Sequence, residues 1–164
     1  MSLPRLPSGL LPFVVLVTYL LTILPLPGVL VHAKPFWLGL LMIWLALEQP
    51  ERGSLGVALI LGLGADVLLG TWFGEHAFRL VVITFIVRRF RPRLRFFTLW
   101  QQTLAVGALL LNDRIVILML RSFASPTSPD LLFWLPALVG MLMWPLLVIA
   151  LDDLRQRLRT RGAG

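Results

Sequence analysis

The sequence predicts an all-α fold, a bundle of six transmembrane helices in a polytopic membrane protein. Of its 164 residues, 58% are hydrophobic, whereas a soluble domain is about 45–50% apolar. The mean hydropathy is +0.88, and short polar segments divide the chain into apolar runs. A spanning helix takes about 20 residues, so six of them leave no room for a soluble domain. Residues 1–164 are therefore expected to form a single integral membrane domain.

Prolines, glycines and polar turns bound the first three expected helices. Pro25 and Pro27 break the apolar run that begins at Leu10. Pro35 suits the first turn of a helix, where its missing N–H is not needed. A polar turn over residues 48–52 then separates the second helix from the third. The expected helices cover residues 10–24, 35–47, and 53 or 54 to 70.

A basic segment and a loop rich in proline and serine separate the last three expected helices. Residues 88–95, centred on Pro92, are predicted to form a basic loop. Residues 122–130 are also predicted to form a loop, because prolines and serines interrupt helices. Residues 152–164 read as a basic tail. The expected helices cover residues 77–87, 99–120 and 131–151.

Arginine clusters set the expected orientation of the chain in the membrane. Cytoplasmic flanks of membrane helices are rich in Lys and Arg, so an even number of spans with both termini in the cytoplasm is predicted. The net charge of +7 could also attract anionic lipids or a cytoplasmic partner, although membrane insertion alone explains it. Nucleic-acid binding is not expected, because no soluble fold presents the charge. The clustered residues are Arg88, Arg89, Arg91, Arg93, Arg95, Arg155, Arg157, Arg159 and Arg161.

The third expected helix carries a small or polar residue at every fourth position. Residues four apart share one face of a helix, and small side chains there allow a second helix to approach closely. The face therefore indicates either packing within the bundle or the docking of a partner's helix. Its members are Ala58, Gly62, Asp66, Gly70 and Gly74.

Asp66 is expected to meet the polar residues of the fifth helix. A carboxylate in the membrane costs about 2.5–3.5 kcal/mol and normally faces a partner. At 1.5 Å per residue, Asp66 lies about 18 Å and Arg114 about 22 Å along their helices. An intramembrane cluster of Asp66 with Asn112, Asp113 and Arg114 is therefore predicted. It could lock two helices together or form a proton or ion site.

No pattern indicates an enzyme, a metal site or a cofactor. The chain has no cysteine, which excludes thiolate catalysis and disulfides. It also lacks a nucleophile elbow, a glycine-rich phosphate loop and an HExxH motif. Glu75, His76 and Arg79 are interpreted as a solvated turn.

Three segments resemble the MreD family of rod shape-determining proteins. They are Lys34-Pro35 with Trp44 and Pro50, the run Gly62-x-x-x-Asp66-x-x-x-Gly70-x-x-x-Gly74-Glu75-His76-Ala77, and the stretch from Arg88 to Gln102. The resemblance implies a non-enzymatic subunit of the bacterial cell-elongation complex that sits in the inner membrane beside an MreC-like membrane protein. Through that protein it would link MreB filaments to the RodA polymerase and its penicillin-binding transpeptidase. In fold, the family also resembles the substrate-binding subunits of vitamin transporters.

Two other functions are weighed against this membrane scaffold. A small-molecule transporter subunit would need several convergent polar groups, and the sequence offers few candidates. An intramembrane enzyme would need paired acid and base groups beyond the Asp66 cluster.

Overall fold

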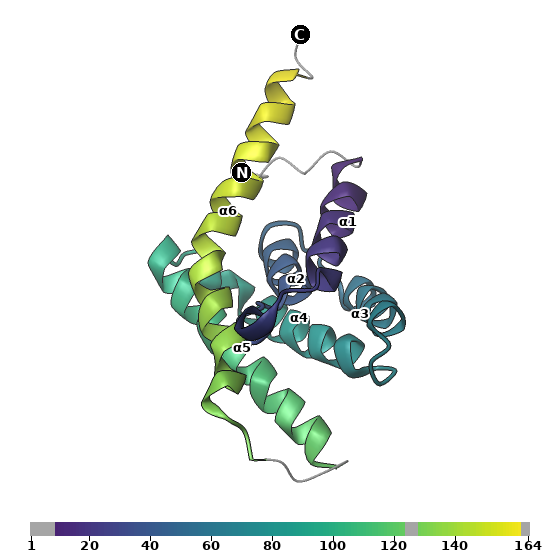
Figure 1. Cartoon of the computed structure of the whole chain (residues 1–164). Helices are drawn as coiled ribbons and strands as arrows, with labels where there is room; N and C mark the ends of the chain where they lie inside the picture. Colours follow the sequence, from purple (N-terminus) through teal and green to yellow (C-terminus); the bar gives the residue numbers. More distant parts are fainter. Residues whose placement is uncertain (1–8, 124–127, 162–164) are drawn as a thin grey trace.

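Six α-helices and two short 3-10 helices make up the part of the chain that the computed structural model describes, residues 9–123 and 128–161. The prediction of an all-helical fold with six main helices is confirmed for these residues. Figure 1 shows α6 as the longest helix, with one end extending beyond the other helices. The elements in order are α1 (Leu10–Ile23), η1 (Gly28–Val31), α2 (Trp37–Glu48), α3 (Leu55–Leu69), α4 (Glu75–Leu94), α5 (Leu99–Ser122), η2 (Leu131–Trp134) and α6 (Leu135–Arg161).

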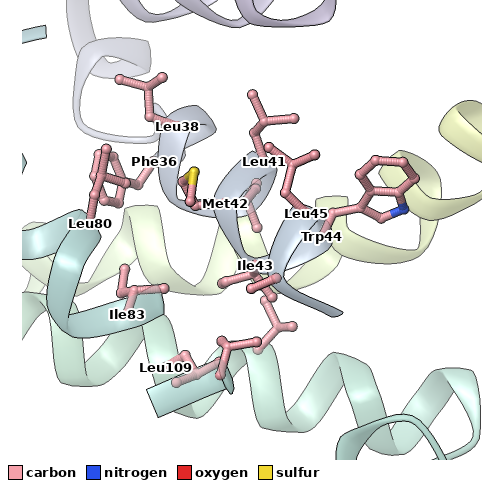
Figure 2. Close-up of a cluster of buried hydrophobic side chains, with 14 of the residues drawn as sticks. Phe36, Leu38, Leu41, Met42, Ile43, Trp44, Leu45, Leu80, Ile83 and Leu109 are labelled. Atoms are coloured by element: carbon pink, nitrogen blue, oxygen red, sulfur yellow. The ribbon is translucent and has the colours of Figure 1, made fainter. Parts of the chain in front are cut away.

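α2 forms the centre of the bundle. Every residue from Leu38 to Leu47 is buried, and α2 contacts α1, α3, α4 and α6. A helix that is apolar on all sides is stable only when other elements surround it. Figure 2 shows this core, in which Leu80 and Ile83 of α4 pack beside the α2 side chains.

Large apolar side chains also cover the outside of the bundle. Leu20 of α1, Ile60 of α3 and Leu142 of α6 are each more than half exposed. By length and composition, α5 and the helical segment Leu131–Arg157 could each cross a membrane, whereas α1, α2 and α3 are shorter apolar helices. An apolar exterior of this extent suits lipid rather than water.

Residues 88–94 of the basic segment are helical, so the loop predicted over residues 88–95 is wrong. α4 continues to Leu94 with Pro92 inside it. Arg91 Nε donates to the carbonyl of Leu47 at 2.9 Å, and Arg88 Nη1 donates to the carbonyl of Pro50 at 2.7 Å. These bonds satisfy a carbonyl at the end of α2 and one in the turn after it. They hold the last turns of α4 against α2, which sequence patterns did not reveal.

The predicted basic tail is also helical as far as Arg161, because α6 continues through it. Asp153 accepts a hydrogen bond from Arg157 Nε at 2.8 Å, and Asp152 lies 3.8 Å from Arg155. Pairs of opposite charge three or four residues apart support a helix. The side chains of Arg159 and Arg161 lie outside the described part of the chain.

Candidate functional site

The face shared by Ala58, Gly62 and Asp66 is buried against α4 of the same chain. Ala58 is fully buried and Asp66 is 2% exposed. A Cβ added to Gly62 would lie 2.2 Å from the Cα of Ala77, so the two backbones touch. Of the two alternatives left open by the sequence, the geometry matches packing within the bundle. These three residues are not available to a partner's helix.

Gly70 and Gly74 do not belong to this face, which corrects the prediction of five residues in one row. Gly70 ends α3 with a φ of 60°, and Gly74 precedes α4 with a φ of 101°. Such left-handed angles favour glycine because it has no Cβ. The two glycines reverse the chain so that α4 can return along α3.

Asp66 binds this turn and not the fifth helix, so its predicted contact with Asn112 or Arg114 is wrong. Oδ2 accepts from the backbone N–H of Gly74 at 2.8 Å, and Oδ1 accepts from the backbone N–H of His76 at 2.9 Å. Oδ1 also accepts from the Thr71 hydroxyl at 2.9 Å and lies 2.9 Å from His76 Nδ1. The carboxylate thereby satisfies N–H groups at the start of α4 that have no partner within the helix.

Asp113 of α5 is paired with Arg79 of α4. Arg79 Nε donates to Oδ1 at 2.8 Å and Nη2 donates to Oδ2 at 2.7 Å. The Arg79 guanidinium also lies 3.9 Å from the centre of the Phe36 ring. Two parallel bonds between guanidinium and carboxylate are a strong, well-oriented contact.

His76 and Arg79 are therefore not in a solvated turn, which corrects that interpretation. They are 7% and 6% exposed. A signal was available in the sequence, because a charged residue inside an apolar helix usually has a buried partner. A buried Asp113 predicts a cation on a neighbouring helix, and Arg79 is that cation.

The other two residues of the predicted cluster do not join Asp66. Arg114 lies over the ring of Phe133 in η2, 5.4 Å from its centre. Asn112 is half-buried. Comparing distances along the two helices thus predicts the polar part of α5 but pairs it with Asp66, whereas its Asp113 binds Arg79.

A further contact joins the start of α4, directly after the α3–α4 turn, to the C-terminal end of α5. Glu75 lies 3.4 Å from Arg121 and 3.9 Å from Arg79. Together with the Arg79–Asp113 pair, this forms one line of alternating charges between the two helices. Its members satisfy one another, which stabilises a packing arrangement rather than presenting a reactive group.

Lys34 connects the start of α2 with the end of α1. Its Nζ donates to the carbonyls of Thr22 and Leu24, which lie at the C-terminus of α1. A lysine often satisfies the last carbonyls of a helix in this way. Burial lowers the pKa of Lys34.

Arg155 is the one buried arginine of the two basic clusters among the residues whose side chains are described. It is 8% exposed and lies 5.1 Å from the Trp44 ring centre. Its Nη1 is 3.7 Å from Glu48 Oε2. By contrast, Arg89, Arg93 and Arg95 are exposed.

No group of three or more His, Cys, Asp or Glu side chains that could hold a metal occurs in the described ranges. The charged side chains inside the bundle instead hold helices and turns together. Long apolar helices with an apolar exterior and internal ion pairs define a helical membrane protein.

Comparison with known proteins gives the family. The family described as rod shape-determining protein MreD matches residues 5–153. The rod shape-determining protein MreD of Haemophilus influenzae is 29% identical over 146 residues, which are 87% of this chain and 88% of that protein. No solved structure matches. The chain belongs to the MreD family, as the resemblance in three segments of the sequence predicted.

Proposed function

We propose that this protein is a non-enzymatic inner-membrane subunit of the bacterial cell-elongation complex. The family match over residues 5–153 carries the proposal. In this role the protein docks an MreC-like membrane protein and thereby contributes to rod shape and peptidoglycan synthesis. MreB filaments, the RodA polymerase and its penicillin-binding transpeptidase are indirect partners.

The charged side chains inside the bundle bond to other parts of the bundle, which supports the proposed role as a scaffold. Asp66 fixes the α3–α4 turn, and the Arg79–Asp113 pair joins α4 to α5. Ion pairs of this kind define how helices sit against one another. A bundle with fixed helix positions can present a constant outer surface to its partners.

The proposed topology has six spans with both termini in the cytoplasm. The end of α4 carries exposed Arg89, Arg93 and Arg95, and the end of α6 carries Arg157. Placing both basic ends on the cytoplasmic side satisfies the positive-inside rule. The short helices α1, α2 and α3 would then cross as parts of a bundle whose central helix is shielded from lipid.

A vitamin-type transporter subunit is the less favoured alternative. It depends on polar side chains that converge on one cavity, but the candidates bond to separate parts of the backbone. The Thr18 hydroxyl donates to Val14, the Tyr19 hydroxyl donates to Leu61, and Asp66 accepts from the α3–α4 turn. Retention of a small water-soluble molecule through purification would revive this alternative.

Depletion in a rod-shaped host tests the proposal. Cells depleted of the protein should become round, and the protein should co-purify with the MreC-like partner from detergent extracts. Re-expression of the wild-type chain should restore both properties and serves as the control. Depleted cells that keep their rod shape and their normal rate of wall synthesis would contradict the proposed role.

A further inference from the structure

An apolar groove lies between α1 and α6, with α2 as its floor. Its volume is about 370 Å³. Val14, Val17 and Leu21 of α1 face Leu147 and Leu151 of α6 across it, and Leu41 of α2 lies at the base. The hydroxyl of Thr18, also in the lining, donates to the carbonyl of Val14 at 2.8 Å and offers no free donor.

The length of the groove matches one leaflet of a bilayer. Its α6 wall runs from Met143 to Leu154, which at 1.5 Å per residue is about 16 Å. The hydrocarbon core of a bilayer is about 30 Å thick, so the groove spans roughly half of it. The wall ends beside the charged part of α6.

Arg155 lies beside that end of the groove, next to the lining residue Leu154. It follows Leu154 and is one helical turn beyond Leu151, and both leucines line the groove. The residue is 8% exposed, and its Nε and Nη2 have no hydrogen-bond partner in the structure. A buried donor left without an acceptor costs about 1–3 kcal/mol, so this position favours a ligand that brings an acceptor.

Two carboxylates flank the Arg155 guanidinium. Glu48 Oε2 and Asp152 Oδ1 lie 3.7 and 3.8 Å from Nη1, which is too far for hydrogen bonds. Their side chains are 26% and 47% exposed. The end of the groove therefore offers a buried cation beside accessible anions, which is complementary to a headgroup that carries both charges.

We infer that the groove binds one phosphatidylethanolamine molecule from the cytoplasmic leaflet. An acyl chain lies between α1 and α6, the phosphate accepts from Arg155 Nε and Nη2, and the ammonium group faces Glu48 and Asp152. A partner's helix fits less well, because close helix packing in lipid uses small residues, and Thr18 and Ala150 are the small residues in a lining otherwise made of larger apolar side chains. A purely anionic headgroup would meet the two carboxylates unfavourably.

Native mass spectrometry of the full-length protein, purified in detergent and mixed with phosphatidylethanolamine or phosphatidylglycerol, tests this inference. We expect one retained phosphatidylethanolamine, held about tenfold more tightly than phosphatidylglycerol, a ratio that corresponds to about 1.4 kcal/mol. The variants Arg155→Gln and Ala150→Phe should each lower its retention about tenfold. The second variant fills the groove and leaves the charges in place.

Ile149→Phe is the matched control, since Ile149 precedes Ala150, is 58% exposed and does not line the groove. It should retain lipid as the wild type does, and circular dichroism should show that all three variants fold. Equal retention of phosphatidylglycerol would overturn the headgroup assignment. Lipid retention by Ala150→Phe would overturn the site, and loss of a partner membrane protein from that variant without loss of lipid would assign the groove to the partner.

Discussion

Arg79 and Asp113 join α4 to α5 through two parallel hydrogen bonds, and the same guanidinium lies 3.9 Å from the Phe36 ring centre beside the start of α2. Their side chains are 6% and 1% exposed. Both charges are therefore almost completely shielded from water in the folded protein. This pair therefore fixes the positions of three helices around one buried contact.

Removing either partner should destabilise the protein much more than removing both. Arg79→Leu leaves Asp113 buried without a cation, and Asp113→Leu leaves the arginine without an anion. Each should lower the free energy of unfolding by about 3–5 kcal/mol, whereas apolar replacement of both partners is often close to neutral. The free energy of unfolding of the double variant should be about 1 kcal/mol lower than that of the wild type, because the contact of Arg79 with Phe36 is lost.

Thermal unfolding of the purified variants in detergent, followed by circular dichroism, measures these differences. The exposed pair of Asp153 and Arg157, with side chains 55% and 76% exposed, provides the control. Replacing both of its members by Leu should change stability by only about 0.3–0.5 kcal/mol. A double Arg79 and Asp113 variant no more stable than the single variants would show that the pair is not the main contact.

Asp66→Asn should loosen the α3–α4 turn. Both carboxylate oxygens accept backbone N–H groups, from Gly74 and His76, and an amide would point its own NH₂ at one of them. The free energy of unfolding should fall by about 1–3 kcal/mol, which is the cost of a buried donor without an acceptor. Asp152→Asn, whose side chain is 47% exposed, should change stability by about 0.5 kcal/mol or less.

Hydrogen exchange localises the effect of Asp66→Asn. Backbone amides of residues 74–77 should exchange faster in this variant than in the wild type, while those of α2 should keep their protection. Unchanged exchange at this turn would mean that Asp66 is not what holds the start of α4.

Sequence patterns predicted the helices because prolines, glycines and polar turns interrupt the apolar runs. They failed for the ends of α4 and α6, where arginine side chains extend the helices. Arg91 reaches the carbonyl of Leu47, far away in the sequence, and no local pattern contains that contact. The periodicity of small residues predicts one face of five residues, of which Ala58, Gly62 and Asp66 are buried, whereas Gly70 and Gly74 lie at the ends of the α3–α4 turn.

The partner of Asp66 was not predictable from depth along a helix. Its carboxylate accepts hydrogen bonds from backbone N–H groups eight and ten residues later in the chain, those of Gly74 and His76. That contact depends on left-handed backbone angles at Gly70 and Gly74, which a regular helical row does not include. The sequence places Asp113 in the bundle interior, but the grouping of Arg79 with Glu75 and His76 in a solvated turn hides the pair that the two residues form.

Gly62→Ala should be destabilising, whereas Gly56→Ala on the same helix should not. The added Cβ at position 62 would lie 2.2 Å from the Cα of Ala77, while at position 56 the nearest atom would be 3.9 Å away. The first change forces α3 and α4 apart and should cost about 1–3 kcal/mol. The second should stabilise by up to about 1 kcal/mol, because alanine is a better helix former than glycine.

Thermal unfolding of the two alanine variants in the same detergent checks this difference in sign. Size-exclusion chromatography should show the same particle size for both variants, which excludes aggregation as the cause. A stable Gly62→Ala protein would show that α3 and α4 are not in backbone contact.

Single cysteines test the proposed topology, because the chain has no cysteine of its own. Phe73→Cys and Phe123→Cys lie at the turns after α3 and α5, and these side chains are 76% and 87% exposed. Phe96→Cys, at a side chain that is 90% exposed, and Arg157→Cys lie near the basic ends of α4 and α6. With six spans and the positive-inside rule, the first pair faces the periplasm and the second pair faces the cytoplasm.

A maleimide that cannot cross the inner membrane should label the first pair in intact spheroplasts and the second pair only after permeabilisation. The contrast should be nearly complete, because a charged helix end does not cross the hydrocarbon core spontaneously. The comparison of Phe96→Cys with Arg157→Cys is the decisive one, since an even number of helices from α5 to the end of the chain returns it to the same side. Labelling of one but not the other in intact spheroplasts would mean that α5 or α6 does not cross the membrane, and that the two basic helix ends do not share the cytoplasmic surface.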